Sequence, residues 1–216
     1  AYAEDLIMLP GISLHGGYAA DGSWDYDPEL YGTIIAPTTP EGVKFYNPAI
    51  DRGTVLDGFL IVGADAGGQG GLTQAVSVDG CAPSITHNAI FAGQANVCRA
   101  LGAEAGADPL VASNVMFGAN CQSASQVVRV VDSGLELFGN EITGGQATTC
   151  VGVLLERAAT ALIEYNQIFG GEAGGGPVAD QALTVGLLST GLFDKLVVTY
   201  NAIEGGQAAG RSPVTI

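Results

Sequence analysis

The feature that most constrains this chain is an asparagine that recurs at a fixed interval between short aliphatic segments. In each copy, Ile or Met stands two positions after the asparagine and an aliphatic residue stands three positions before it. The recurring residues are Asn88, Asn114, Asn140, Asn166 and Asn201, with spacings of 26, 26, 26 and 35 residues. A fixed period of this length indicates a solenoid, in which each repeat forms one coil and packs against its neighbours.

The repeats are built from short β-prone segments and glycine turns, and none is long enough for a useful helix. The aliphatic residues flanking each asparagine, such as Ile85 and Ile90, lie five positions apart, so a straight strand would turn them to opposite faces. We therefore expect a sharp corner at the asparagine, with the asparagine itself in the left-handed backbone conformation. Stacked coils would then align the asparagine side chains in a hydrogen-bonded ladder.

A second aliphatic segment occurs in most repeats, as in 127–131 and 151–155, so three short strands and their turns fit within one period. In this pattern the chain resembles the right-handed parallel β-helix superfamily, the pectin-lyase-like fold, whose coils carry a similar V-x-I-x-x-N-x-I-x-G-G sequence. The resemblance covers Gly53 to Ile216 and implies an all-β, right-handed, single-stranded parallel β-helix solenoid. The opening stretch 12–18, followed by Trp24, resembles the first coils of secreted bacterial surface β-helix proteins of unknown role.

We interpret residues 1–216 as a single β-helix domain. Residues 1–52 would form irregular first coils with a surface loop, and residues 53–216 the regular coils, in which Phe59 takes the asparagine position of the earliest unit. About eight coils, each about 4.8 Å thick, would make a rod about 38 Å long. The longer final interval is explained by a loop insertion at 171–177.

The charge balance excludes two classes of partner. The chain has 22 acidic and 7 basic residues and a formal net charge of -15. Nucleic acids and anionic membranes both require a basic face, which such a chain does not provide. No apolar segment approaches the roughly 18 residues that a membrane-spanning helix needs, so we expect no membrane insertion.

The four cysteines permit three pairings. Cys98 and Cys150 share one coil position but lie two coils apart, about 9.6 Å, which is too far for a disulfide. Cys121 lies in the intervening coil and could reach either of them if its loop bends. We favour Cys98 with Cys121, and the alternative is that the cysteines, Cys81 included, are buried free thiols. With the acidity and the repeat pattern, the cysteines favour an extracellular or cell-surface location, with the secretory signal absent from this chain or already removed.

The resemblance brings polysaccharide lyases and hydrolases into consideration, but the residues do not match their chemistry. A lyase needs a basic cleft, and the seven Lys and Arg residues share no phase of the repeat. Strings resembling the hydrolase motifs N-T-D, D-D and G-H-G do not occur, and aspartates such as Asp57 are expected to be solvated turn residues. We assign no catalytic residue and no enzymatic activity. The sequence leaves open a catalytic pair of carboxylates, because such a pair is recognised by the distance between the two groups in space.

Candidate ligand sites are few. Two histidines and four widely spaced cysteines predict no zinc site. One acidic loop, containing Asp21, Asp25, Asp27 and Glu29, could ligate calcium, although its spacing matches no EF-hand, and no other cofactor is indicated. Tyr165 and Tyr200 share the position before the asparagine, where a sugar-stacking strip could form, but non-aromatic residues interrupt that row and we expect core or edge packing.

The two ends of the chain fall at nearly the same phase of a coil, that of Leu155, and neither end carries a polar cap. We therefore expect an extracellular structural or adhesive protein, most concretely a protomer that stacks head to tail into a fibre. The stacking residues would be Tyr2, Leu6, Leu9, Val214 and Ile216. One alternative is an excised segment of a larger surface adhesin, continued by flanking β-helix. Another is a carbohydrate-binding or polysaccharide-cleaving β-helix, which should show a carboxylate-lined groove on one sheet face.

Overall fold

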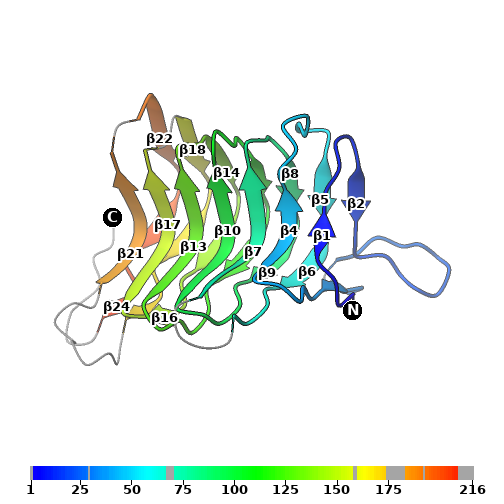
Figure 1. The fold of residues 1–216 in the computed structure, drawn as a ribbon, viewed down its shortest axis with the longest axis horizontal. Helices are drawn as coiled ribbons and strands as arrows, with labels where there is room; N and C mark the ends of the chain where they lie inside the picture. The colour runs from blue at the N-terminus through cyan, green and yellow to red at the C-terminus, as the bar shows by residue number, and fades with distance from the viewer. Residues whose placement is uncertain are drawn as a thin grey trace.

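The computed structural model describes residues 2–28, 30–66, 71–157, 160–173, 183–191 and 193–208. Within them the chain is all-β, and its strands run parallel and wind around one core as a β-helix (Figure 1). Three long sheets contain seven strands each, and every turn of the chain contributes one strand to each sheet in the same order. In the part of the chain that is described, no helix is long and apolar enough to span a membrane.

Each sheet runs the length of the solenoid. The first sheet contains β1 (Leu6–Ile7), β4 (Glu41–Phe45), β7 (Leu72–Asp79), β10 (Val97–Glu104), β13 (Ala124–Val131), β17 (Thr149–Glu156) and β21 (Leu183–Thr190). The second contains β2 (Ser13–His15), β5 (Val55–Asp57), β8 (Ser84–Thr86), β11 (Leu110–Ala112), β14 (Leu135–Phe138), β18 (Thr160–Glu164) and β22 (Lys195–Thr199). The third contains β3 (Thr33–Ile35), β6 (Phe59–Val62), β9 (Ala89–Phe91), β12 (Val115–Phe117), β15 (Glu141–Thr143), β19 (Gln167–Phe169) and β23 (Ala202–Glu204). A small sheet joins β16 (Gln146–Ala147), β20 (Glu172–Ala173) and β24 (Gln207–Ala208).

The repeat period of the sequence sets the register between neighbouring strands of these sheets, since residues one period apart lie side by side. Val111 in β11 pairs with Ile85 in β8 and with Leu137 in β14, which lie one period away on either side. All three side chains are at most 1% exposed, because each points into the core on top of its neighbour. The predicted stack of aliphatic residues, and with it the parallel β-helix, is confirmed.

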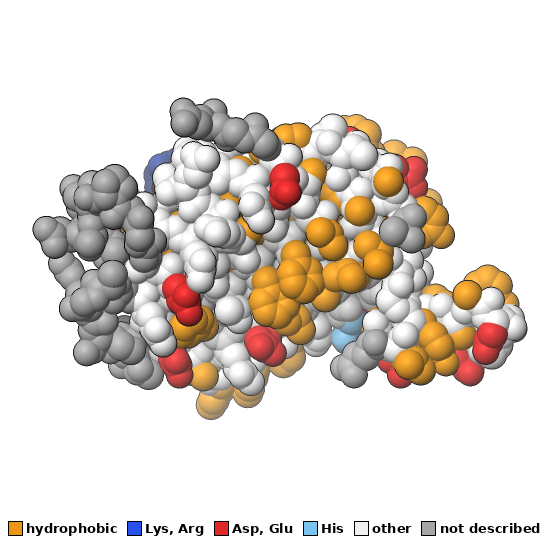
Figure 2. Space-filling view, turned by 90° about the horizontal axis from the view of Figure 1, so that it is seen from below, with side chains coloured by type: hydrophobic (Ala, Val, Ile, Leu, Met, Phe, Trp, Pro, Cys, Tyr) orange, Lys and Arg blue, Asp and Glu red, His pale blue; other side chains and the backbone are white. Residues whose placement is uncertain are grey.

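Residues 16–28 leave the coil between β2 and β3 and form a hairpin that we call the arm. Tyr18 and Tyr26 form its antiparallel bridge, and the Asp27 amide donates to the Gly17 carbonyl at 2.7 Å. In Figures 1 and 2 the arm projects from the N-terminal end of the solenoid. Among the arm's side chains, Trp24 is 73% exposed.

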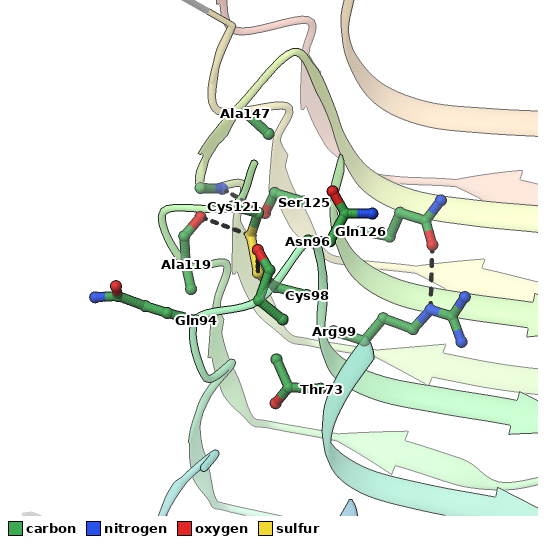
Figure 3. The surroundings of a disulfide bond; sticks show 12 residues. Thr73, Gln94, Asn96, Cys98, Arg99, Ala119, Cys121, Ser125, Gln126 and Ala147 are labelled. Atoms are coloured by element: carbon green, nitrogen blue, oxygen red, sulfur yellow. Dashed lines mark hydrogen bonds between the residues drawn. A yellow bond between two sulfur atoms is a disulfide. The ribbon is translucent and has the colours of Figure 1, made fainter. Parts of the chain in front are cut away.

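The disulfide joins Cys98 and Cys121, whose Cα atoms are 6.1 Å apart, as favoured from the sequence (Figure 3). Cys98 lies in β10, and Cys121 lies in the turn before β13, which brings it to the Cys98 coil. Ser125 occupies the coil position between Cys98 and Cys150. Cys81 and Cys150 are buried free thiols, so for these two cysteines the alternative of unpaired thiols is confirmed.

The corner between the second and third sheets differs in one respect from our prediction. The residue before the asparagine adopts the left-handed conformation, with φ of 50° at His87, 56° at Ser113 and 59° at Tyr165. None of the described asparagines has a positive φ. The reason is packing: the bend comes one residue earlier, so the asparagine side chain turns inward, where Asn114 is 1% exposed.

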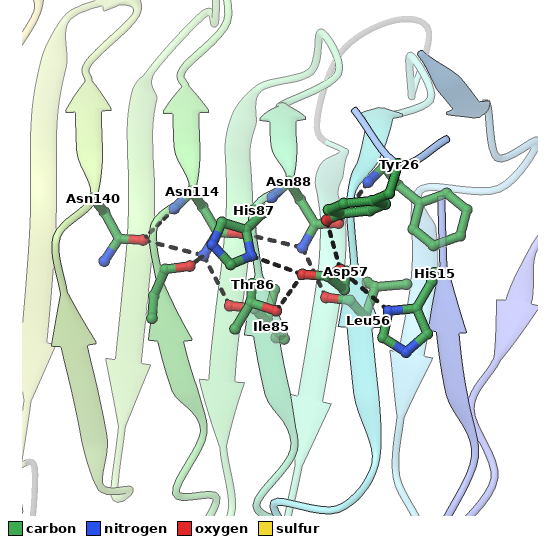
Figure 4. Close-up of polar contacts among 12 residues, drawn as sticks. His15, Tyr26, Leu56, Asp57, Ile85, Thr86, His87, Asn88, Asn114 and Asn140 are labelled. Carbon is green, nitrogen blue, oxygen red and sulfur yellow. Dashed lines mark hydrogen bonds and ion pairs between the residues drawn. The ribbon is translucent and has the colours of Figure 1, made fainter. Parts of the chain in front are cut away.

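These inward side chains form the predicted ladder (Figure 4). Asn114 Nδ2 donates to the Ile85 carbonyl at 2.8 Å and to Asn140 Oδ1 at 3.1 Å, while Asn114 Oδ1 accepts the Asn88 backbone amide at 2.9 Å. The same pattern continues through Asn166 to Asn201. Each asparagine therefore ties its own coil to the coil before it.

Candidate functional site

Both histidines of the chain contact one carboxylate. His15 Nδ1 lies 3.2 Å from Asp57 Oδ2, and His87 Nδ1 lies 2.8 Å from Asp57 Oδ1. The Tyr26 hydroxyl donates to Oδ2 at 2.8 Å, and the Thr86 hydroxyl donates to Oδ1 at 2.7 Å. We call these five residues the Asp57 clasp (Figure 4).

The clasp residues come from separate parts of the sequence. His15 ends β2 and pairs in register with Asp57 at the end of β5, which in turn pairs with Thr86 at the end of β8. Tyr26 reaches the carboxylate from the arm. Our prediction that Asp57 is a solvated turn residue was wrong, because the residue is 8% exposed and lies inside a strand. The first coils do not follow the regular period, so spacing alone could not bring these residues together.

The surroundings of Asp57 keep its carboxylate ionised. Burial by itself raises the pKa of Asp57, but the hydrogen bonds from Thr86, His87, Tyr26 and His15 outweigh it and lower the pKa to about 2. Burial and the same carboxylate raise the pKa of Tyr26 to about 12. Asp57 is thus an acceptor of hydrogen bonds near neutral pH and has no proton to give to a substrate.

The arrangement fastens the arm to the solenoid. The two histidines belong to the coils on either side of Asp57, and their rings flank the carboxylate with one nitrogen directed at it (Figure 4). No three His, Cys, Asp or Glu side chains among the described residues are grouped so that they could hold a metal ion. The buried Asp57 carboxylate connects β2, β5, β8 and the arm.

A pH titration tests the clasp. Because the folded pKa of Asp57, about 2, lies below its ordinary value of 3.8, its ionisation stabilises the fold above about pH 4, and this contribution is lost as the pH falls toward 2. The difference corresponds to about 2 kcal/mol. We expect Asp57→Asn to lower the free energy of unfolding by about that amount at pH 7, measured by urea denaturation, and the gap to wild type to close near pH 2. A gap that is the same at both pH values would contradict this assignment.

A second feature is a groove of about 520 Å³ near the corner between the first and second sheets. Asp108, Asp132, Glu136 and Lys195 line it, together with smaller polar and apolar residues. Arg52 pairs with Asp108 at 3.3 Å and with Glu136 at 3.4 Å. The groove residues recur at the repeat period, as Asp108, Gly134 and Thr160 do, but their side chains share no chemical pattern, so their spacing did not indicate a groove.

One carboxylate of this groove, that of Asp132, is held by an arginine. A bidentate contact from Arg157, at 2.7 and 2.9 Å, lowers the pKa of Asp132. Across the described chain, every carboxyl group whose pKa departs clearly from its ordinary value has it lowered.

Two basic residues come together on the outer face of the first sheet, which their spacing did not indicate. Arg129 bonds Glu104 at 3.1 Å and Glu156 at 2.6 Å, and Arg99 bonds Gln74 at 3.2 Å. Burial, reinforced by the nearby Arg129 charge, lowers the pKa of Arg99 to about 10. Both guanidinium groups are engaged by neighbours on the sheet, so the cluster binds the strands together.

The N-terminal end of the solenoid is apolar. Tyr2 pairs with Ile35 beside β3, and an apolar hollow of about 290 Å³ opens next to it. The hollow is lined by Tyr2, Glu4, Leu6, Leu14, His15, Thr33, Ile35 and Phe59. Of the predicted stacking residues, Tyr2 and Leu6 line this hollow and Leu9 is exposed nearby, whereas Val214 and Ile216 lie outside the described residues.

The remaining predicted positions are on the surface. Asp21, Asp25 and Asp27 lie on the arm, where Asp21 accepts the Ser23 amide, and Glu29 lies outside the described residues. Tyr165 and Tyr200 were expected in core or edge packing. They are not in the core, since both are exposed at the coil corner, but they pack there against each other with ring centroids 4.9 Å apart. Their left-handed backbone points the rings away from the core.

No protein-family model matches the chain, and neither the curated proteins nor the solved structures contain a significant match.

Proposed function

We propose that the chain is an extracellular structural or adhesive β-helix that associates end to end through its N-terminal face with a second copy of itself. The observation that carries the proposal is the concentration of exposed apolar side chains at that end. Tyr2, Leu9, Ile12, Trp24 and Leu30 are each at least 45% exposed. Tyr2 lines the apolar hollow, and the other four belong to the first coil and its arm. Exposed apolar surface of this kind is typical of protein interaction sites.

The geometry of the end favours a β-coil as its partner. Tyr2, β1 and β2 are the outermost strand positions of the three long sheets. Among the described residues no strand pairs on their outer side, where a further parallel strand could be added. Only a coil with the same three-sided cross-section can extend all three sheets at once. The coil formed by β21, β22 and β23 of a second copy has that cross-section.

Two further features support the proposed location and role. The buried Cys98–Cys121 disulfide is stable in an oxidising compartment, which fits secretion to the cell exterior. The pectin-lyase-like relationship inferred from the repeat agrees with such a location, as does the high content of acidic residues. Because the net charge of -15 makes copies repel one another, association through an apolar face should strengthen when salt is added.

A second candidate function, carbohydrate binding, is favoured by the groove of about 520 Å³. Its ionised carboxylates and Lys195 can exchange hydrogen bonds with sugar hydroxyls, and Leu162 and Val197 add apolar surface. Retention on an insoluble neutral polysaccharide that Lys195→Ala abolishes would support this candidate over the first.

Light scattering and negative-stain electron microscopy over a range of concentrations test end-to-end association. We expect rods that lengthen with concentration, more so above about 0.15 M salt. Tyr2→Glu should weaken association at least about tenfold, because it places a charge in the apolar hollow. Tyr46→Glu is the matched control, since Tyr46 is 53% exposed against 58% for Tyr2 but does not line the hollow. A wild-type chain that stays monomeric, or equal effects of both substitutions, would overturn the proposal.

A further inference from the structure

Two exposed tyrosines occupy equivalent corners of successive coils. Tyr165 follows β18 and Tyr200 follows β22, and each directly precedes a ladder asparagine. Their ring centroids are 4.9 Å apart and the ring planes differ by 12°. Phe138, one coil earlier, packs its ring at an angle of 64° against Tyr165. The two phenol rings are thus parallel neighbours that solvent can reach, with 53% and 75% of each residue exposed.

The backbone under these rings is fixed. Asn166 donates two hydrogen bonds to Asn201 Oδ1, one from its backbone amide at 2.8 Å and one from its Nδ2 at 2.9 Å. The Tyr165 amide donates to the Thr199 carbonyl at 3.3 Å. Both tyrosines have the same left-handed backbone, with φ of 59° and 57°, so their Cα–Cβ bonds leave the coil in the same sense. The rings are held beside each other in the native fold and need no search to meet.

Phenols in this arrangement can be joined by oxidation. Removal of one electron and one proton from each tyrosine leaves two phenoxyl radicals, whose unpaired electrons are shared with the ring carbons next to the oxygen. Combination of two such carbons forms one C–C bond. Each of these carbons then gives up its hydrogen as a proton while the oxygen of the same ring takes up a proton, so both rings become aromatic phenols again. In total two hydrogen atoms leave the protein, and one molecule of hydrogen peroxide is reduced to two of water. Pairing of groups held in contact is strongly favoured over pairing between molecules.

We propose that Tyr165 and Tyr200 form a site of oxidative modification, at which a peroxidase-type oxidant with hydrogen peroxide produces an intramolecular dityrosine bond. The bond would join β18 to β22 and so add a covalent link between the last two long coils. This inference is independent of end-to-end association, because the reaction takes place within one chain.

The arm supplies an internal comparison. Tyr18 and Tyr26 have ring centroids 5.2 Å apart, but their planes differ by 54°. The Tyr26 hydroxyl is also engaged by Asp57, which with burial raises its pKa to about 12 and disfavours the phenolate, the form most easily oxidised. Coupling at Tyr165 and Tyr200 should therefore exceed coupling in the arm.

The test treats the dilute full chain with peroxidase and hydrogen peroxide and follows dityrosine fluorescence, intact mass and peptide mapping. We expect a product of monomeric mass that has lost two hydrogen atoms, with the cross-linked peptides containing residues 165 and 200. Tyr165→Phe and Tyr200→Phe keep the stacked ring but remove the phenol, and each should lower the yield at least about tenfold. Tyr46→Phe, which removes another exposed phenol, should leave the yield unchanged.

Two results would overturn the inference. One is a yield that survives Tyr200→Phe, which would place the coupling elsewhere. The other is a product found only as covalent dimers, which would show that the rings do not meet within one chain. Thermal unfolding of each variant, followed by circular dichroism, verifies that a lost yield does not reflect a lost fold.

Discussion

Replacing Asn114 by alanine is expected to lower the free energy of unfolding by about 3–5 kcal/mol. The side chain is 1% exposed and takes part in hydrogen bonds with both neighbouring coils. Its loss leaves the Asn88 amide and the Ile85 carbonyl without their buried partner, and each such group costs about 1–3 kcal/mol. The cavity left by the side chain adds to this cost.

Urea denaturation of Asn114→Ala and Asn120→Ala measures the effect against a matched control. Asn120 lies in the turn six positions later and is exposed, so its replacement should change stability by no more than about 0.5 kcal/mol. Equal effects of the two substitutions would mean that the ladder hydrogen bonds add no more to the free energy of unfolding than an exposed asparagine does.

An even simpler change, Gly145→Ala, should destabilise the fold by at least about 3 kcal/mol or prevent folding. A Cβ atom at this position would lie only 2.0 Å from the Ala119 carbonyl oxygen, in the adjacent coil. Neither backbone can move away, because the Cys121 amide donates to the Gln146 carbonyl and the Gln146 amide to the Ala119 carbonyl across the same two coils. The added methyl therefore forces the coils apart.

Gly32→Ala provides the control for this steric argument. A Cβ atom at Gly32 would meet nothing within 4 Å, and its backbone is not in the left-handed region. We expect its thermal midpoint to stay at or slightly above the wild-type value, since alanine restricts the unfolded chain. If Gly145→Ala unfolded at the same temperature as Gly32→Ala, the close packing of these coils would be disproved.

The core of the fold was predictable because its determinants repeat. Asn114 and the aliphatic residues around it recur at a constant interval, and a constant interval becomes a constant register when coils stack. The same arithmetic excluded a Cys98–Cys150 disulfide but left Cys121 within reach of either cysteine, and the favoured pairing, Cys98 with Cys121, is the one that forms. The position of the left-handed residue was missed by one, because the sequence shows which residue is constant and the bend occurs at the variable residue before it.

The candidate site was much less predictable. The Asp57 clasp unites His15, Tyr26 and His87 across intervals that the period does not relate, and one partner arrives from an arm outside the coil. Two of the groove residues, Asp108 and Glu136, are paired with Arg52, which reaches them from an earlier coil. Such contacts depend on the direction of side chains and on the conformation of loops, which the spacing of residues in one sequence does not reveal.

The corner that precedes each asparagine separates what the coil requires from what the coil displays. His87, Ser113, Gly139, Tyr165 and Tyr200 share one backbone conformation although their side chains range from none to a large aromatic ring. The asparagine that follows each of these residues makes the hydrogen bonds between coils, so the corner residue before it can change without altering the register. The corner residues therefore form a row spaced about 4.8 Å apart along the regular coils, in which side chains can be exchanged one by one without a change of fold.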